Sequence, residues 1–234
     1  MSVIVERITS ARQQLAFELQ RFMLLWRYQH AVPPFTLWWR LVLKRVTDIA
    51  GAAILLALLS PIMLVLAILI KLDSRGPVFF VQERLGWFGR PFNMVKFRSM
   101  IQDAEAATGP VWCGREGDAR ITRLGRFLRS SHLDELPQLF NVVMGEMSLV
   151  GPRPERACFV TQLQESVPSY DHRHYVKPGM TGLAQVHYRY DQSIADVKKK
   201  LRFDLLYVKR MCLLLDARIL AWTFLVCVTG RGIK

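Results

Sequence analysis

Two adjacent acids, Asp134 and Glu135, have the best side chains in this sequence for chemistry on a phosphate ester. The segment 131–138 predicts the first turn of a helix, with Ser131 as its N-cap and Pro137 tolerated at an early position. Free backbone N–H groups and the positive end of the helix dipole favour ionised carboxylates there. Acidic residues at such a position are also common as simple helix caps, so the pair alone does not establish a site.

Basic residues near the acids favour a phosphate-binding site over a simple helix cap. Arg153 stands between Pro152 and Pro154, and this stiff stretch can present its planar guanidinium to a phosphate or a nucleobase at little cost in ordering. A rigid surface turn with a solvated arginine is the alternative. Lys96 and Arg98 close a β-prone run and offer two further cations. Upstream of the acids lie four arginines that complete a cationic ring suited to a polyphosphate: Arg120, Arg123, Arg126 and Arg129.

Composition narrows the class of partner. The 234 residues include 32 Lys and Arg against 19 Asp and Glu, a formal net charge of +13, and 51% are hydrophobic. This hydrophobic content excludes intrinsic disorder. It also favours an anionic membrane surface or phosphorylated substrates over a nucleic acid, because a nucleic-acid binder normally carries such charge on a more polar chain. The four cysteines show no CxxC spacing, so we expect reduced thiols rather than a zinc site or a disulfide framework.

An uncharged run over residues 49–70 predicts a membrane anchor. As a helix it would measure about 33 Å, enough for a hydrocarbon core of about 30 Å. Ser60-Pro61 predicts a sharp bend, because Pro61 cannot donate to the carbonyl of Ala57, and the serine hydroxyl could satisfy that carbonyl. Basic residues on both flanks favour a re-entrant segment that enters and returns on the cytoplasmic side. A kinked helix that spans the membrane is the alternative.

The first 40 residues predict an amphipathic helix. Apolar side chains recur there at spacings of three and four from Ile4 to Trp26, and Pro33 and Pro34 end the pattern. Such a stripe can pack against a neighbouring element, lie on a membrane surface or form a homodimer. The sequence leaves these three readings open.

Beyond the anchor the composition is that of a soluble domain. Two β-prone runs, 77–82 and 92–97, predict a hairpin or two edge strands, and 183–188 predicts a third strand. Helices are predicted over residues 122–128, 133–144, 155–165 and 193–207. Residues 108–118 predict a glycine-containing loop, and 176–181 a Pro-Gly turn.

The last apolar segment, 213–229, contains Asp216 and Arg218 and predicts an interfacial or packed helix. The expected fold class is α+β and predominantly helical. Its expected parts are an N-terminal extension (1–40), a re-entrant membrane helix hairpin (41–75) and a cytosolic, interfacial catalytic domain with short strands (76–234).

Five motifs, in this order, resemble the bacterial sugar transferase family, the monotopic phosphoglycosyl transferases. The resemblance runs from about residue 44 to the C-terminus and leaves residues 1–40 without an interpretation. The motifs are Phe80-x-Gln82-x-Arg84-x-Gly86-x-x-Gly89, Lys96-Phe97-Arg98-Ser99-Met100, Leu133-Asp134-Glu135-Leu136-Pro137-Gln138, Met147-Ser148-Leu149-Val150-Gly151-Pro152-Arg153-Pro154 and Pro178-Gly179-Met180-Thr181-Gly182.

The resemblance implies an enzyme that moves a sugar 1-phosphate from a UDP-sugar to polyprenyl (undecaprenyl) phosphate, at the cytoplasmic face of the bacterial inner membrane. Asp134 would be the nucleophile, forming a covalent phosphosugar as UMP leaves, and Glu135 a metal ligand or an acid/base partner. Mg²⁺ on the two acids would offset the charge of the diphosphate. The family's helix-breaking pair matches Ser60 and Pro61.

By the same resemblance, Arg153 with Pro152 and Pro154 matches a nucleotide-contacting motif, and Lys96 and Arg129 fall near the phosphates. A membrane-anchored binding or scaffolding homologue without turnover is the alternative, and the intact acids argue against it. A nucleic-acid binder rests on net charge alone and does not account for the uncharged run. The sequence does not identify the sugar, the glycan pathway or the oligomeric state.

Overall fold

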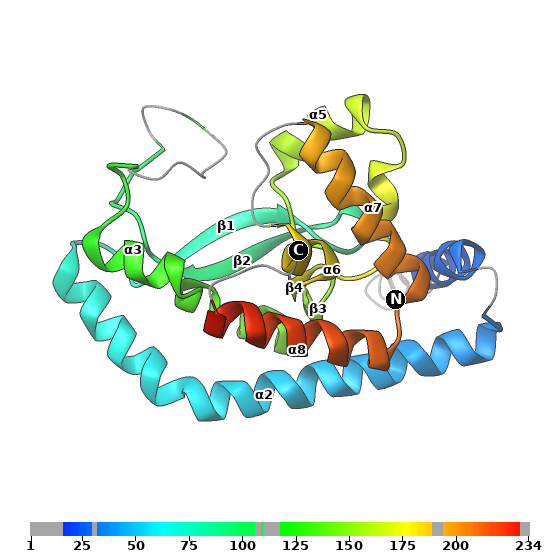
Figure 1. Cartoon of the computed structure of the whole chain (residues 1–234), viewed down its shortest axis with the longest axis horizontal. Coiled ribbons are helices and arrows are strands. Elements are labelled where there is room, and N and C mark those ends of the chain that lie inside the picture. The colour runs from blue at the N-terminus through cyan, green and yellow to red at the C-terminus, as the bar shows by residue number, and fades with distance from the viewer. Residues whose placement is uncertain (1–15, 30–31, 106–108, 110–117, 189–193, 230–234) are drawn as a thin grey trace, which may run out of the picture.

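A long helix, α2 (Pro34–Asp73), runs along one side of the molecule in the computed structural model (Figure 1). The structure describes residues 16–29, 32–105, 109, 118–188 and 194–229. Among these, α2 is the one helix long and apolar enough to cross a membrane by length and composition. Pro34 suits its first turn, because the N–H that proline lacks has no helical partner there. The helix is therefore longer than the apolar run alone predicted.

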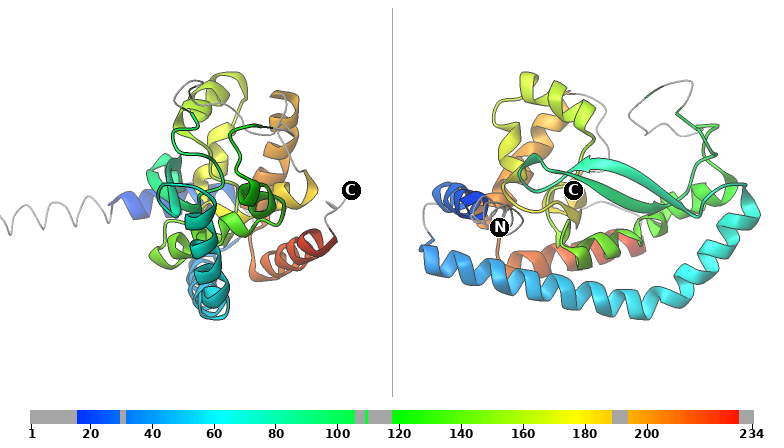
Figure 2. Two further views of the ribbon diagram at one scale, coloured as in Figure 1. Left: turned by 90° about the vertical axis from the view of Figure 1, so that its left-hand side faces the viewer. Right: turned by 180° about the vertical axis from the view of Figure 1, so that it is seen from behind.

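α2 stays continuous through Pro61 and curves along its second half (Figures 1 and 2). The Ser60 hydroxyl donates to the carbonyl oxygen of Ala57 at 2.9 Å, and this is the carbonyl that Pro61 leaves without a backbone donor. The bend and its repair by serine agree with the sequence prediction. The structure shows one bent helix and does not show a hairpin of two arms.

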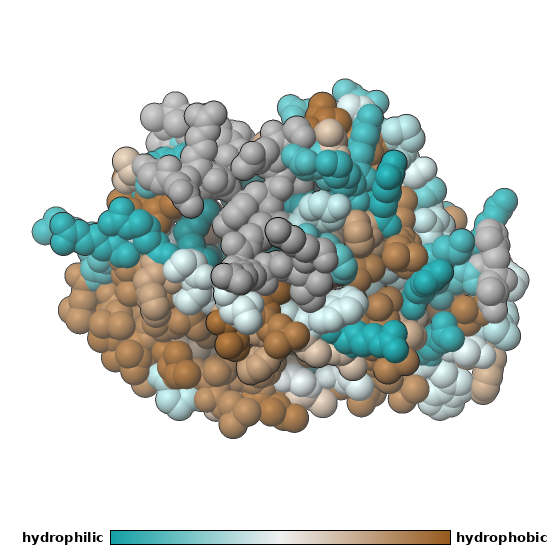
Figure 3. Space-filling view, viewed as in Figure 1, coloured by the Kyte–Doolittle hydropathy of each residue, from teal (hydrophilic) through white to brown (hydrophobic). Residues whose placement is uncertain are grey.

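One side of α2 packs on the protein and the other is exposed and apolar. Leu58, Leu64 and Leu72 are 68%, 64% and 79% exposed. Figure 3 shows hydrophobic side chains over the lower left of the molecule, where α2 runs. An apolar surface this broad marks a membrane or partner contact, because water solvates it poorly.

Two basic residues of the flank that suggested a re-entrant topology contact protein groups instead. Lys44 donates to Asp216 in α8 (Leu213–Thr229), and Arg45 donates to two carbonyls at the end of α4 (Gln138–Met144). Both cations therefore serve tertiary packing. Fewer positive charges of this flank therefore remain to hold it at the cytoplasmic side of a membrane.

Two small sheets form the centre of the molecule. β1 (Phe79–Leu85) and β2 (Pro91–Phe97) form the predicted antiparallel hairpin, joined through the short turn η1 (Trp87–Gly89). β3 (Ser148–Val150) pairs in parallel with β4 (Gly179–Thr181), where a Pro-Gly turn was predicted. A Cβ on Gly179 would lie 2.0 Å from the Gly151 nitrogen, so this close approach of two chains requires glycine.

Most of the remaining helices match the prediction, with two corrections and one addition, the short helix η3, which was not predicted. The strand predicted over 183–188 is a short helix, because one turn buries Leu183, Ala184 and Val186 together, and a short apolar run does not distinguish strand from helix. The helix predicted over 133–144 is split into the turn η2 and helix α4. The other helices are α3 (Arg123–Ser130), η2 (Leu133–Glu135), α5 (Ala157–Ser166), η3 (Tyr170–Tyr175), α6 (Leu183–His187) and α7 (Ile194–Arg210).

The N-terminal helix, described over residues 16–28, packs against the rest of the protein. Leu25 is buried in the main core, and the Gln29 amide donates to the Val208 carbonyl at 2.6 Å. Tyr28 makes edge-on ring contacts with His172 and Tyr175 of η3. Of the three readings of its apolar stripe, packing against a neighbour therefore describes these residues. Residues 1–15 of the predicted helix, and nearly all of the loop predicted over 108–118, lie outside the described residues.

Candidate functional site

Glu135 is the centre of a cluster of charges on η2. Its carboxylate accepts from Lys96 Nζ at 2.7 Å and from Arg153 Nη2 at 2.6 Å, with Arg153 Nη1 at 3.3 Å from its second oxygen. Burial works to raise the pKa of Glu135, but Arg153 and Lys96 outweigh it and hold that pKa well below its usual range. The Glu135 carboxylate is therefore ionised throughout the physiological pH range.

Asp134 differs from its neighbour in having no such partner among the residues that the structure describes. Its carboxylate accepts no hydrogen bond from any residue that the structure describes, although the residue is only 9% exposed. Burial and the adjacent charge of Glu135 raise its pKa, while Lys96, Arg129 and Arg153 oppose that rise. A buried carboxylate with unused lone pairs and nearby cations is suited to attack an electrophile.

The turn that carries the acids is set by the end of α3. Ser131 was predicted to be an N-cap, and this prediction is wrong. Its hydroxyl donates back to the Phe127 carbonyl at 2.7 Å, and the residue ends α3. His132 then adopts a left-handed conformation with φ 59°, which is uncommon outside glycine. The chain thereby turns so that the acids lie in a tight 3₁₀ turn.

Asn141 ties the helix after the acids to the strand that carries Lys96. Its Oδ1 accepts from the Val95 N–H at 3.0 Å, and its Nδ2 donates to the Asn93 carbonyl at 2.8 Å. Asn141 is fully buried, so these bonds are shielded from water. α4 and β2 are thus held in register, with Lys96 facing Glu135. The sequence analysis did not identify this residue.

Arg153 is held through its backbone as well as its side chain. The carbonyls of Pro152, Arg153 and Pro154 accept from the Gly179 N–H, Arg173 Nη2 and Arg84 Nη1 at 2.9, 2.9 and 3.2 Å. The Arg153 side chain remains 40% exposed. The Pro-Arg-Pro segment is therefore rigid, yet its guanidinium can reach a ligand.

The sequence analysis also missed the residues behind this segment. Arg173 pairs with Asp204 at 2.8 Å and donates to the Tyr170 hydroxyl at 2.7 Å, and Arg173 and Asp204 are almost wholly buried. A signal was present: Asp204 falls on the same helical stripe as Val197, Leu201 and Val208, where an acid requires a buried partner.

Not every predicted cation joins the cluster. Arg98 donates to the carbonyls of Ser74 and Arg75 at 2.6 and 2.8 Å and so caps the end of α2. Arg120 pairs with Asp118 at 2.6 Å, and Arg123 and Arg126 are exposed. Of the four upstream arginines, Arg129 is the one whose charge lowers the pKa of Asp134.

The donor set is compatible with Mg²⁺ shared with a substrate. Among the described residues, no group of three or more His, Cys, Asp or Glu side chains gathers into a metal cage. Mg²⁺ is commonly held by one or two carboxylates together with substrate phosphates. Asp134 and Glu135 could supply such ligands.

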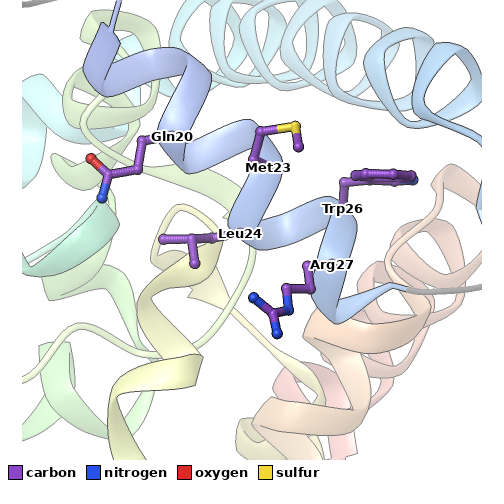
Figure 4. Close-up of a pocket in the computed structure, with 5 residues that line it drawn as sticks. All are labelled: Gln20, Met23, Leu24, Trp26 and Arg27. Carbon is purple, nitrogen blue, oxygen red and sulfur yellow. The ribbon is translucent and has the colours of Figure 1, made fainter.

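A separate cavity of about 340 Å³ adjoins the N-terminal helix. Its lining residues are Gln20, Met23, Leu24, Trp26 and Arg27 (Figure 4). None of them is an acid or a nucleophile, so this cavity does not compete with the acid pair as a reaction site.

Comparison with known proteins identifies the family. The bacterial sugar transferase family matches residues 39–230, and the chain belongs to this family. It is 44% identical over 192 residues to the UDP-N-acetylgalactosamine-undecaprenyl-phosphate N-acetylgalactosaminephosphotransferase of Aeromonas hydrophila, which covers 82% of this chain and 45% of that protein.

Two further relatives carry related names. The UDP-glucose:undecaprenyl-phosphate glucose-1-phosphate transferase of Xanthomonas campestris pv. campestris is 47% identical over 185 residues, covering 78% of this chain and 38% of that protein. The exopolysaccharide production protein PSS of Rhizobium leguminosarum bv. phaseoli is 41% identical over 202 residues, covering 82% of this chain and 98% of that protein. The chain spans less than half the length of the Aeromonas and Xanthomonas relatives.

Proposed function

We propose that this chain transfers a sugar 1-phosphate from a UDP-sugar to polyprenyl phosphate, with Asp134 as the nucleophile. The observation that carries the proposal is the contrast within the acid pair: Glu135 is held by two cations, whereas Asp134 accepts no hydrogen bond from a described residue. The names of the relatives support the donor and acceptor classes.

In the first step, an Asp134 oxygen attacks the β-phosphorus of the UDP-sugar. The bond between that phosphorus and the bridging oxygen breaks, and UMP leaves with the oxygen. In the second step, a phosphate oxygen of the polyprenyl phosphate attacks the same phosphorus. The bond to Asp134 then breaks, so the carboxylate is regenerated and the lipid carries the sugar diphosphate.

The cations of the site serve both steps. Lys96, Arg129 and Arg153 act electrostatically on the acid pair. They would stabilise the negative charge that builds up as an anionic carboxylate approaches an anionic diphosphate, because positioned cations stabilise such a transition state. Glu135 suits a role in holding these cations or a metal rather than in carrying a proton, because its pKa is far below the working range. Bound Mg²⁺ would neutralise further phosphate charge.

The decisive experiment traps the enzyme with UDP-sugar and no lipid acceptor. We expect one equivalent of UMP and a phosphosugar mass on the peptide that contains Asp134. Asp134→Asn should lose turnover by at least about 10³-fold, because the nucleophile is gone. It should also keep or gain thermal stability, since its neutral amide carries no buried charge. Retained turnover in this variant would remove Asp134 from the role.

We further propose that α2 is re-entrant, with both ends at the cytoplasmic face of the inner membrane. Single cysteines in place of Phe35 and Asp73, in a chain without its native cysteines, test this topology. Both positions are exposed in the structure. An impermeant maleimide should label neither in intact spheroplasts and both after lysis. Labelling of one end alone in intact spheroplasts would show that the helix crosses the membrane.

A further inference from the structure

The second half of α8 carries an exposed apolar stripe. The first half is anchored, with Asp216 bonded to Lys44 and Tyr207, and Ile219 wholly buried. At the middle of the helix, the hydroxyls of Thr223 and Thr181 lie 2.7 Å apart. Beyond that contact the helix end stands out from the body in the left view of Figure 2.

The stripe consists of Leu220, Phe224 and Val228, which are 41%, 69% and 68% exposed. Their spacing of four residues puts them on one face of the helix. That face adjoins Thr223, whose hydroxyl contacts Thr181. Exposed apolar side chains in a row on an anchored helix indicate contact with a hydrocarbon or an apolar partner.

The helix that carries this stripe packs beside β4, through the contact of Thr223 with Thr181. β4 in turn holds the segment that leads to Arg153. The Gly151 N–H donates to the Thr181 carbonyl at 2.8 Å, and the Gly179 N–H donates to the Pro152 carbonyl at 2.9 Å. The α8 stripe is therefore joined through β4 to the segment that carries Arg153.

The two surfaces together fit a molecule with a phosphate at one end and a hydrocarbon at the other. Lys96, Arg129 and Arg153 match the phosphate, and the α8 stripe matches the chain. A UDP-sugar has no apolar part that would gain from such a stripe.

We propose that the α8 stripe, formed by Leu220, Phe224 and Val228, holds the prenyl chain of the acceptor while its phosphate reaches the phosphosugar on Asp134. This inference rests on the proposed function and deepens it. It assigns acceptor recognition to α8 and leaves the first step, which needs no lipid, independent of that helix.

The test separates the two steps with the full chain in nanodiscs. Phe224→Ser should raise the KM for undecaprenyl phosphate roughly tenfold, because the apolar area of one aromatic side chain is lost to the acceptor. The burst of UMP from UDP-sugar without lipid should stay unchanged. With a short-chain prenyl phosphate, the difference from the wild-type chain should shrink, since less hydrocarbon reaches the stripe.

Leu214→Ser is the matched control. Leu214 is 62% exposed on the same helix, but it lies on the outer face near the other end, and its variant should keep the wild-type KM for the acceptor.

An unchanged KM in Phe224→Ser would overturn the inference, as would an equal loss in the lipid-free burst. A change of oligomeric state in Phe224→Ser, seen by light scattering, would assign the stripe to contact between copies instead. Failure of the wild-type chain to release UMP would refute the proposed function itself.

Discussion

Two lysine–carboxylate pairs in this protein have the same geometry and different surroundings. Lys44–Asp216 and Lys96–Glu135 each join at 2.7 Å. Their side chains are about equally buried, at 10% exposed for both members of the first pair and 14% for both members of the second. Neither distance nor burial therefore distinguishes the pair that ties α2 to α8 from the pair beside the candidate nucleophile.

The difference lies in whether the neighbouring carboxylates have partners. Around Lys44, Asp216 also accepts from the Tyr207 hydroxyl at 2.7 Å, and Asp48 accepts from the Leu149 N–H at 3.1 Å. Around Lys96, Asp134 accepts no hydrogen bond from a described residue. A satisfied network gives rigidity, whereas an unsatisfied carboxylate among cations has lone pairs left for a substrate.

Removal of Lys44 should have the largest effect on stability. Lys44→Met leaves Asp216 as a buried charge with one neutral donor, and loss of one member of a buried pair costs roughly 3–5 kcal/mol. We expect a free energy of unfolding lower by about that amount in chemical denaturation. In the double variant Lys44→Met with Asp216→Leu, part of the loss should return, because Asp216 is no longer an unpaired charge, whereas the buried Asp48 still lacks the Lys44 cation that lay 3.8 Å from it. A double variant as unstable as the single one would contradict the pairing argument.

Removal of Lys96 should instead affect activity and its pH dependence. Lys96 opposes the rise that burial and Glu135 impose on the pKa of Asp134. Lys96→Met should therefore raise that pKa further. Since the proposed nucleophile must be ionised, the acid limb of kcat/KM should move to higher pH. The plateau should fall roughly 10²-fold, through loss of a cation that we propose to stabilise the substrate phosphates.

Lys199→Met on the exposed side of α7 is the control for charge alone. It should leave the acid limb in place. If the two variants gave the same pH profile, the shift would reflect the net charge of the chain and not the contact with the acid pair.

Removal of the Tyr207 hydroxyl should have the smallest effect. Tyr207→Phe deletes a donor to Asp216 and a contact at 2.9 Å to the Val150 carbonyl but keeps the ring and Lys44 in place. We expect a loss of about 1–2 kcal/mol in the free energy of unfolding, with KM for both substrates unchanged. A loss as large as that of Lys44→Met would mean that the hydroxyl, and not the ion pair, dominates the network.

The parts of the site that depend on neighbours in the chain could be predicted from the sequence. The acid pair, the rigid Pro-Arg-Pro segment and the β1–β2 hairpin follow from spacing over a few residues. So does the bond from Ser60 to Ala57, which bridges three residues. The short apolar run at 183–188 was misassigned, because burial of three apolar residues is possible in a strand or in a helix.

The sequence by itself therefore determined which residues form the candidate acid pair and where the long apolar segment lies. Only the tertiary structure decided which cation faces which acid. Lys44 meets Asp216 across 172 residues, and Arg98 turns to the end of α2 although it stands two residues from Lys96. Local propensity acts over a few bonds, whereas the partner of a buried charge depends on how distant elements pack. Among the described residues, that packing gives two cations to Glu135 and no hydrogen-bond donor to Asp134.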